Sequence, residues 1–337
     1  MRRRPRLPPH ADTVGSGSGV NRAAARMEVR IGTLLLANPV MPASGCFGPE
    51  LGSIIDLDRL GALVTKTVFA TPRPGNPAHR LGESYAGMLN SVGIPSGGAQ
   101  SFLDELLPRY AAWSPPTIVS IGGLTVQDYF DVTERLAGAD GIDAFEINIS
   151  CPNLEAGGLE IGAVPETVEE VVRGVVERSP VPVIAKLTPN VTSVGSIARA
   201  AEHGGATALS AVNALMGMAI DPRTRRARIG TITAGVTGPA IKPIALRCVW
   251  QAAQAVSIPV IGIGGIATAD DAVEFLLAGA SAVQVGSASF TRPDTMIRLV
   301  EELPDRIAAA GARDAGDLVG NVLTEPAAHD LAGVISH

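Results

Sequence analysis

The chain has 337 residues, of which 46% are hydrophobic and only 4% are aromatic. This length suits one large α/β domain or two smaller ones, and the apolar content excludes a disordered chain. The formal net charge of −6 at pH 7, with no basic cluster expected after residue 30, argues against nucleic acid as a partner. No stretch reaches the roughly 18 apolar residues that a membrane helix needs.

Three cysteines occur in the chain: Cys46, Cys151 and Cys248. They form no CxxC pair and show no metal-ligand spacing, so we expect no disulfide framework, no iron–sulfur cluster and no other metal site in this chain. Unpaired cysteines are typical of a reducing compartment, which favours the cytoplasm.

Residues 1–26 differ from the rest of the chain. Four arginines precede Pro-rich and Gly/Ser-rich stretches, and no apolar segment follows them, which excludes a secretory signal. An Arg-rich stretch with the single acid Asp12 also fits a transit peptide, but we interpret residues 1–26 as a disordered leader, with an upstream start codon and a domain that opens near Met27 as the alternative. We therefore expect one domain over residues 27–322 and a tail over residues 323–337.

From Asn38 onward the sequence repeats one pattern: a short β-branched run, a loop rich in Gly, Pro and Asn, and an apolar stripe at helical spacing. The stripe is clearest over 165–179, 193–204 and 240–256. Pro165 would stand in the first turn of the first of these helices, where proline is well tolerated. We predict eight strands, each followed by a helix, at 39–43, 62–66, 117–121, 144–148, 181–186, 206–212, 258–262 and 281–285.

Eight such units in about 280 residues predict an α/β fold, a closed (β/α)8 TIM barrel. An open doubly wound sheet is the alternative, but it usually has fewer strands and a reversal of strand order. Two insertions are expected after strands two and six, over 68–98 and 213–237, the second as a hairpin around Asp221. Both follow strand ends, on the face where barrels keep their active sites.

Polar residues suited to chemistry come directly after the predicted strands. Because the carboxyl ends of barrel strands converge on one pocket, residues far apart in the sequence become neighbours there. The set comprises Ser44, Lys66, Ser120, Asn148, Cys151, Lys186 and Asn213, with the pairs Gly264-Gly265 and Gly286-Ser287.

The two glycine-containing pairs follow strands seven and eight, the usual phosphate site of this fold. Glycine lets backbone N–H groups approach an anion closely, and the next helix adds the positive end of its dipole. Tight turns without a ligand are the alternative. Since no GxGxxG opens a βαβ unit, we predict FMN rather than a dinucleotide.

Lys66 and Lys186 each end an apolar strand. A lysine buried at a barrel mouth needs an anionic partner, so we predict that both place positive charge beside the pyrimidine ring of a flavin. Ion-paired or snorkelling lysines are the alternative. Cys151 lies between two asparagines on a glycine-rich loop, which favours a chemical role. Cys248 is typical of a helix core, and Cys46 is ambiguous.

Together these segments resemble the class 1 dihydroorotate dehydrogenases, and the 1B subclass most closely, over roughly residues 28–311. NISCPN at 148–153 with TGPAIKP at 237–243 is a specific combination. The other matching segments are MPASG (41–45), VTKTV (64–68), NSVGIP (90–95), AKLTPNV (185–191), VNALMGM (212–218), IPVIGIGGI (258–266) and AGASAVQVGSA (278–288).

The resemblance implies an FMN enzyme of pyrimidine biosynthesis that oxidises dihydroorotate to orotate. It implies Cys151 as the base that takes a proton from C5 while hydride passes from C6 to the flavin. The substrate contacts that it implies are Lys66, Asn90, Ser91, Val92, Gly93, Ile94, Asn148, Asn153, Asn213 and Ala214. The FMN contacts that it implies are Ser44, Lys66, Thr67, Ser120, Asn148, Lys186, Val212, Gly238, Gly264, Gly265, Gly286 and Ser287.

The resemblance also implies partners. Class 1B enzymes pass electrons to NAD through a separate subunit that carries FAD and a 2Fe–2S cluster, and the family is expected to form homodimers. Class 2 enzymes use a membrane quinone and a serine base. Cys151 and the lack of a hydrophobic leader argue against that class.

Three positions depart from the family pattern. Asn is usual where Ser120 stands, Thr or Ser where Ala214 stands, and Thr where Cys46 stands. One alternative is a flavoenzyme of the dihydropyrimidine dehydrogenase type, although that family usually has His where Asn153 stands. A second alternative, supported only by Ala214 and Ser120, is an inactive barrel that acts as a binding subunit.

Overall fold

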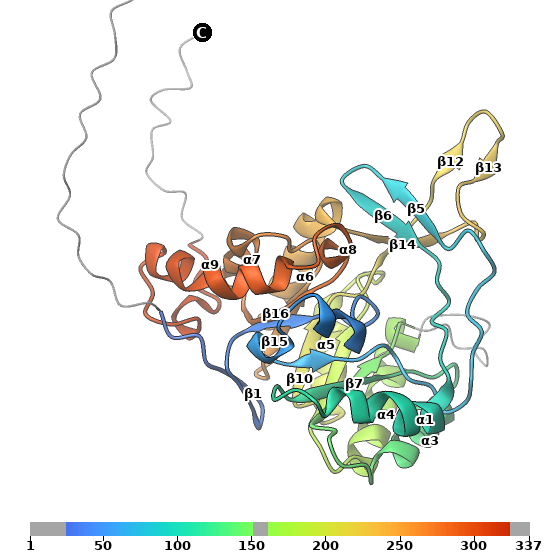
Figure 1. Cartoon of the computed structure of the whole chain (residues 1–337), viewed down its shortest axis with the longest axis horizontal. Coiled ribbons are helices and arrows are strands. Elements are labelled where there is room, and N and C mark those ends of the chain that lie inside the picture. The colour runs from blue at the N-terminus through green and yellow to red at the C-terminus, as the bar shows by residue number, and fades with distance from the viewer. Residues whose placement is uncertain (1–24, 151–160, 324–337) are drawn as a thin grey trace, which may run out of the picture.

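The computed structural model describes residues 25–150 and 161–323 (Figure 1). Most of the expected leader, nearly all of the expected tail, and both Cys151 and Asn153 lie outside the described residues. Ala25 is buried, and the backbone N–H of Arg26 donates to the carbonyl of Arg313 at 3.0 Å. These two residues, expected to end the leader, therefore belong to the folded part of the chain.

A sheet of eight parallel strands forms the centre of the molecule, with the order β3-β16-β15-β10-β9-β8-β7-β4. Every strand overlaps a predicted range, so the barrel prediction is confirmed. The strands are β3 (Val40–Pro42), β4 (Leu63–Val64), β7 (Thr117–Ile121), β8 (Ala144–Asn148), β9 (Val183–Leu187), β10 (Ala208–Ala211), β15 (Val260–Ile263) and β16 (Ala280–Val285).

The ring of strands closes between β3 and β4 through Gly61. Its backbone N–H donates to the carbonyl of Val40 at 2.8 Å, and a Cβ at this position would overlap the carbonyl oxygen of Asn38. The buried Asn38 side chain holds the same turn, because it donates to the carbonyl of Arg59 at 2.8 Å and accepts from the N–H of Val40 at 3.0 Å. Only glycine fits at this closure.

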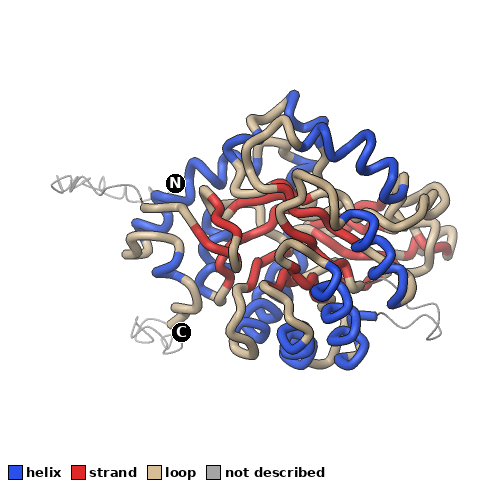
Figure 2. The backbone as a smooth tube through the Cα atoms, turned by 90° about the horizontal axis from the view of Figure 1, so that it is seen from below, coloured by secondary structure: helices blue, strands red, loops and turns tan. Residues whose placement is uncertain are grey.

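Helices surround the strands (Figure 2). Helices α3 and α7 each begin with a capping box, in which a threonine and an aspartate satisfy free N–H groups of the first turn. Pro165 opens α4 as predicted, and Val168, Val171, Val172 and Val175 face the core with no exposed surface. The main helices are α3 (Val126–Leu136), α4 (Pro165–Arg178), α5 (Val194–His203), α6 (Lys242–Ala253), α7 (Ala269–Leu277) and α9 (Thr295–Ala309). Among the described residues, no helix is both long and apolar enough to cross a membrane.

The expectation of an α-helix after every strand is wrong at β3. Two short 3-10 helices follow it, η1 (Pro49–Ser53) and η2 (Leu57–Arg59), because Gly52 and the capping residue Asp56 interrupt any longer run. After β4 the helical segment is divided into α1 (Gly98–Ser101), a π-helical turn η3 (Phe102–Leu106) and α2 (Leu107–Tyr110). A short α8 (Ala288–Thr291) precedes α9.

The segments after β4 and β10 fold together into a second, antiparallel sheet with the order β11-β14-β6-β5, seen beside the barrel in Figure 1. Its strands are β5 (Leu81–Ser84), β6 (Gly87–Asn90), β11 (Leu215–Gly217) and β14 (Ala234–Thr237). On one side, Leu89 packs against Ile229 and Ala234 in a small core of its own. Two segments far apart in the sequence thus form one structural unit.

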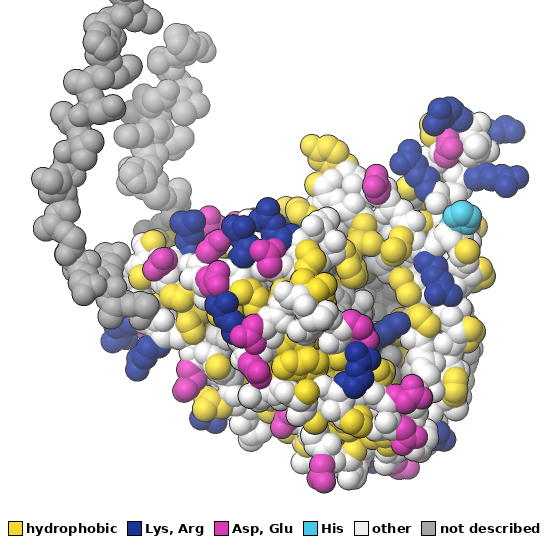
Figure 3. Space-filling view, viewed as in Figure 1, with side chains coloured by type: hydrophobic (Ala, Val, Ile, Leu, Met, Phe, Trp, Pro, Cys, Tyr) yellow, Lys and Arg dark blue, Asp and Glu magenta, His cyan; other side chains and the backbone are white. Residues whose placement is uncertain are grey.

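A hairpin projects from this second sheet. Strands β12 (Ile220–Asp221) and β13 (Arg226–Ala227) pair around the turn that was predicted at Asp221. Its exposed arginines, visible in dark blue in Figure 3, are Arg223, Arg225, Arg226 and Arg228. The expectation that no basic cluster follows residue 30 is therefore wrong.

At the opposite end of the barrel, β1 (Val29–Ile31) and β2 (Leu34–Leu36) form a hairpin. Gly32 at its turn lies directly against Thr207, which stands just before β10. The hairpin therefore covers the amino ends of the strands and leaves the carboxyl ends free for a site.

The closure at Gly61 can be tested by comparing two glycine substitutions. Gly61→Ala should lower the free energy of unfolding by about 1–3 kcal/mol, because the added methyl group forces β3 and β4 apart. Gly138→Ala is the control, since a Cβ there meets no atom within 4 Å. Urea unfolding of both variants measures the difference. Equal stabilities of the two variants would show that the closure between β3 and β4 tolerates a side chain at residue 61.

Candidate active site

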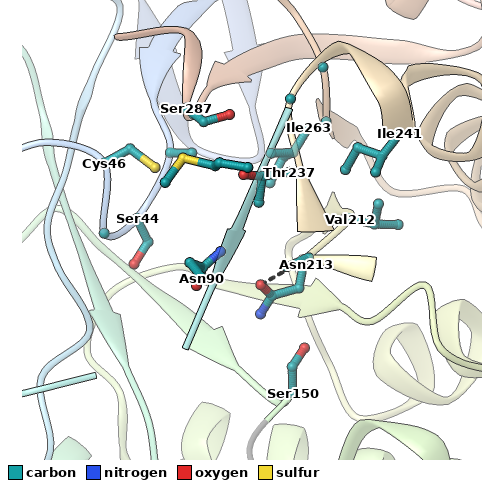
Figure 4. A pocket seen from close by; sticks show the side chains of 18 of the residues that line it. Ser44, Cys46, Asn90, Ser150, Val212, Asn213, Thr237, Ile241, Ile263 and Ser287 are labelled. Carbon is teal, nitrogen blue, oxygen red and sulfur yellow. Dashed lines mark hydrogen bonds between the residues drawn. The ribbon is translucent and has the colours of Figure 1, made fainter. Parts of the chain in front are cut away.

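A cavity of about 630 Å³ lies at the carboxyl ends of the barrel strands, with the second sheet forming part of its wall. Figure 4 shows Ser44, Asn90, Asn213 and Ser287 gathered around this space. The predicted site residues that line it are Ser44, Lys66, Thr67, Asn90, Val92, Ile94, Asn148, Lys186, Val212, Asn213, Ala214, Gly238, Gly264, Gly265, Gly286 and Ser287.

Three predicted contact residues do not line the cavity. Ser120 is fully buried and its hydroxyl lies 3.0 Å from that of Thr67. Ser91 turns its hydroxyl toward the loops, where Asn76 and Thr231 donate to it at 2.9 and 2.8 Å. Gly93 occupies a turn with φ of 70°. Ser120 therefore supports the lining residue Thr67 from behind, whereas Ser91 and Gly93 shape the loops beside the cavity.

Hydrogen bonds connect the polar side chains of the cavity floor. The hydroxyls of Ser44 and Thr67 lie 3.2 Å apart, and Asn148 donates its Nδ2 to Thr67 Oγ1 at 3.4 Å. Asn213 then donates its Nδ2 to Asn148 Oδ1 at 3.0 Å. Because each group is oriented by a neighbour from a different strand, the floor is preorganised before any ligand enters.

The second sheet presents one row of side chains to the cavity. Leu81, Asn90, Gly235 and Met216 are direct partners across its four strands, so they share one face. Asn90 is fixed in this row by donating its Nδ2 to the carbonyl of Gly235 at 3.3 Å. The row places one amide among apolar groups, opposite the polar floor.

Glycines shape one end of the cavity. Gly238, Gly264 and Gly265 have φ values of 100°, 127° and 81°, in the region that glycine adopts without strain. A Cβ on Gly265 would stand 2.9 Å from the carbonyl oxygen of Gly238. The backbone of these loops can therefore approach a phosphate closely, next to the start of α6.

Two observations support a bound group at this end. The Thr237 hydroxyl lines the cavity and is buried, yet within the described residues it has no hydrogen-bond partner. At Gly286, a Cβ would meet only Cys46 and Ala43, at 3.7 and 3.8 Å, so the cavity extends to the backbone there. A phosphate ester with a planar ring system fits both features.

The two predicted lysines differ in environment. Lys186 is buried, and its Nζ lies 3.2 Å from Glu146 Oε1, with side-chain exposures of 5% and 0%. Lys186 is thus ion-paired, which was the alternative to a lysine that faces a flavin. It nevertheless also lines the cavity. Lys66 also lines the cavity, but its side chain is exposed, so the expectation that it is buried is wrong. Partial loss of water around it, with a smaller effect of Arg80, lowers the pKa of its ammonium group.

Cys46 also lines the cavity, which its sequence context left open. Burial raises the pKa of its thiol to about 11, against a smaller opposing effect of the Lys186 ammonium. The thiol therefore stays protonated at neutral pH, and Cys46 is not a suitable base.

Sequence reasoning missed two residues. Glu146 lies on β8 inside the barrel, and a carboxylate within the apolar run FEINIS was the available signal. Asn190 lines the cavity, donates to the carbonyl of Ala214 at 3.3 Å and accepts from the N–H of Met216 at 2.9 Å. It fixes the start of the second inserted segment. The motif AKLTPNV could have pointed to Asn190, because it lies among the segments that match the family, but no function was assigned to its asparagine.

Fold and site define the class of protein: a barrel enzyme whose cavity has a phosphate-type glycine loop, a buried ammonium group and an amide-rich floor. A family model described as dihydroorotate dehydrogenase matches residues 26–307. The chain belongs to the dihydroorotate dehydrogenase family, and this membership implies a flavin cofactor.

Individual relatives refine this placement. A protein of Desulforudis audaxviator named dihydroorotate dehydrogenase B (NAD(+)), catalytic subunit, is 47% identical over 307 residues, which cover 90% of this chain and 98% of the relative. Proteins of the same name from Halalkalibacterium halodurans and Alkaliphilus oremlandii are 44% and 46% identical over 298 residues, covering 88% of this chain and 98% of each relative. The resemblance to class 1B is confirmed, and the name "catalytic subunit" implies a partner subunit.

The hydroxyl of Thr67 contacts two other hydroxyls and one amide, those of Ser44, Ser120 and Asn148, so its removal tests the preorganised floor. Thr67→Val keeps the shape of the side chain but leaves the Asn148 amide and the Ser120 hydroxyl without this partner, which should cost about 1–3 kcal/mol of unfolding free energy. Ser44→Ala, which removes one hydroxyl contact, should cost less. Chemical denaturation of both variants provides the comparison, and a smaller loss for Thr67→Val would contradict the arrangement.

Proposed function

We propose that this protein is the FMN-containing catalytic subunit of a class 1B dihydroorotate dehydrogenase, which oxidises dihydroorotate to orotate in pyrimidine biosynthesis. The observation that carries the proposal is the convergence of Lys66, Asn90, Asn148 and Asn213 on the cavity of a chain that belongs to this family.

FMN is proposed as the flavin because its single phosphate suits the loops at Gly264-Gly265 and Gly286-Ser287. Ser44, Thr67, Val212 and Gly238 would contact the ring system and its side chain, and Lys186 would stand beside the pyrimidine ring. When bound, FMN supplies a hydride acceptor. The other groups proposed to act on dihydroorotate itself are side chains of this chain.

The substrate is proposed to lie on the amide-rich floor. Its ring presents alternating C=O and N–H groups, and amide side chains offer both donors and acceptors to match them. Asn90, Asn148 and Asn213 would hold the ring together with Asn153, which lies outside the described residues. Lys66 would bind the carboxylate, for which an ammonium in a partly dehydrated cavity is well suited.

Cys151 is proposed as the base that takes the proton from C5. The support is its position in NISCPN, together with Ser150, the residue before it, which lines the cavity and donates its N–H to Asn148 Oδ1 at 3.4 Å. A free thiol has a pKa near 8.5, so turnover should rise with pH until the thiolate predominates.

The electron acceptor is proposed to be NAD, reached through a partner subunit that carries FAD and a 2Fe–2S cluster. The support is the name of the relatives and a chain that has no cysteine spacing for a cluster of its own. A homodimer and a cytoplasmic location complete the proposal. Family membership favours this function over the dihydropyrimidine dehydrogenase and inactive-barrel alternatives.

An anaerobic titration tests cofactor, substrate and base together. Dihydroorotate should bleach the flavin absorbance of the purified protein. Cys151→Ala should retain its flavin but be slower by about 10²–10⁴-fold, because the base is missing. Stopped-flow absorbance follows the reaction. Uracil serves as the control ligand. A flavin that dihydroorotate leaves oxidised would overturn the proposal, and full speed in Cys151→Ala would overturn the base.

The lowered pKa of Lys66 predicts a pH-dependent KM. As the pH rises, the ammonium loses its proton earlier than an ordinary lysine, so the KM for dihydroorotate should climb at moderately alkaline pH. Lys66→Gln should raise the KM by about 10–100-fold and remove this climb, since a charged hydrogen bond is lost. Steady-state kinetics across pH measure both effects. Parallel pH profiles for the two proteins would rule out Lys66 as the carboxylate ligand.

A further inference from the structure

A carboxylate network lies inside the barrel, below the cavity floor. Glu146 on β8 has no exposed surface, and its Oε1 accepts from Lys186 Nζ on β9 at 3.2 Å. Its Oε2 accepts from Ser210 Oγ on β10 at 2.9 Å and from Gln284 Nε2 on β16 at 2.8 Å. One carboxylate thus connects four strands across the barrel interior.

Such a group is unexpected at this place, because barrel interiors are normally filled by layers of branched apolar side chains. An isolated carboxylate or ammonium there would be strongly unfavourable. The network solves this problem for both charges at once, since each carboxylate oxygen of Glu146 accepts a hydrogen bond and Lys186 gains an opposite charge. Gln284 is oriented by its hydrogen bond to Glu146 and by a longer contact of its Nε2 with Met41 Sδ at 3.9 Å, while its own Oε1 is buried without a hydrogen-bond partner in the described residues.

The two charges of the Glu146–Lys186 pair lie at different distances from the cavity. Lys186 lines the cavity, whereas Glu146 does not, so the positive end of the ion pair faces the cavity and the negative end is enclosed by the barrel. Of the neighbouring groups, the Cys46 thiol stays neutral because burial raises its pKa to about 11. Ser210, Gln284 and, on β3, Met41 carry no charge. Among the described residues that line the cavity, Lys66, which follows β4, is the other cation.

We propose that Glu146 is a positioning residue for Lys186: its enclosed carboxylate pairs with the Lys186 ammonium and keeps it directed at the flavin site. The part that concerns the flavin rests on the function proposed above, whereas the ion pair does not. The negative charge of reduced flavin would then lie nearer to the Lys186 ammonium than to the Glu146 carboxylate.

The pair itself is tested by a double-mutant cycle in the full-length chain. Glu146→Gln should lower the Tm by on the order of 10 °C, because an ammonium remains buried without its counter-ion. Glu146→Gln combined with Lys186→Met should lose less than the sum of the single variants. Ser210→Ala is the control, since it removes one donor and no charge. Additive losses would overturn the proposal. If Glu146→Gln yields no folded protein, recovery of folding in the double variant supports the pair, and failure to recover overturns it.

The role toward the flavin is tested by the midpoint potential of the holoprotein. Removing the carboxylate takes away the negative charge behind the ammonium, so the positive charge next to the flavin site is no longer compensated. The potential of Glu146→Gln should therefore lie above that of the wild type. Glu146→Asp, which keeps the charge, should follow the wild type.

Equal potentials for Glu146→Gln and wild type would overturn the positioning role, since a residue with a structural role alone changes flavin content and not the potential. Failure of the flavin proposal is recognised separately, because the thermal cycle does not depend on a bound flavin and would still show coupling between Glu146 and Lys186.

Discussion

Closure of the parallel sheet is the constraint on which the rest of the molecule depends. Where Gly61 donates to Val40, eight strands become a ring, and a ring of parallel strands has all its carboxyl ends at one rim. Residues as distant in sequence as Ser44 and Ser287 then line one cavity. The chemistry of the site follows from this geometry, because polar groups from several different strands reach the cavity and no strand could form the site alone.

The cavity has two walls of different origin. The barrel supplies a floor of hydroxyl and amide groups oriented by their neighbours, from Ser44 through Thr67 and Asn148 to Asn213. The second sheet, built from both inserted segments, supplies the opposite wall and has a small core of its own. Below the floor, the ion pair of Lys186 and Glu146 turns its positive end toward the cavity. A rigid polar floor under a separate wall is suited to holding a planar ring system between them.

The strands could be predicted because β-branched runs between glycine-rich loops are a local signal, and the floor because polar residues stand directly at strand ends. The pairing of β6 with β14 could not, since local patterns do not fix the register of strands about 145 residues apart. Ser120 was expected to contact the cofactor, but its hydroxyl is bonded to Thr67 beneath the floor. Glu146 was missed because its partners come from β9, β10 and β16, and only tertiary structure brings them together.

The central claim is that this cavity at the strand ends holds FMN, with the positive end of the Lys186–Glu146 pair beside it. A crystal structure of the purified holoprotein with orotate tests it most directly. The account predicts electron density for a phosphate at Gly264-Gly265 and Ser287, a tricyclic ring beside Lys186, and orotate between that ring and Asn213. A flavin bound elsewhere, or a ring lying away from Lys186 with orotate outside the cavity, would contradict it.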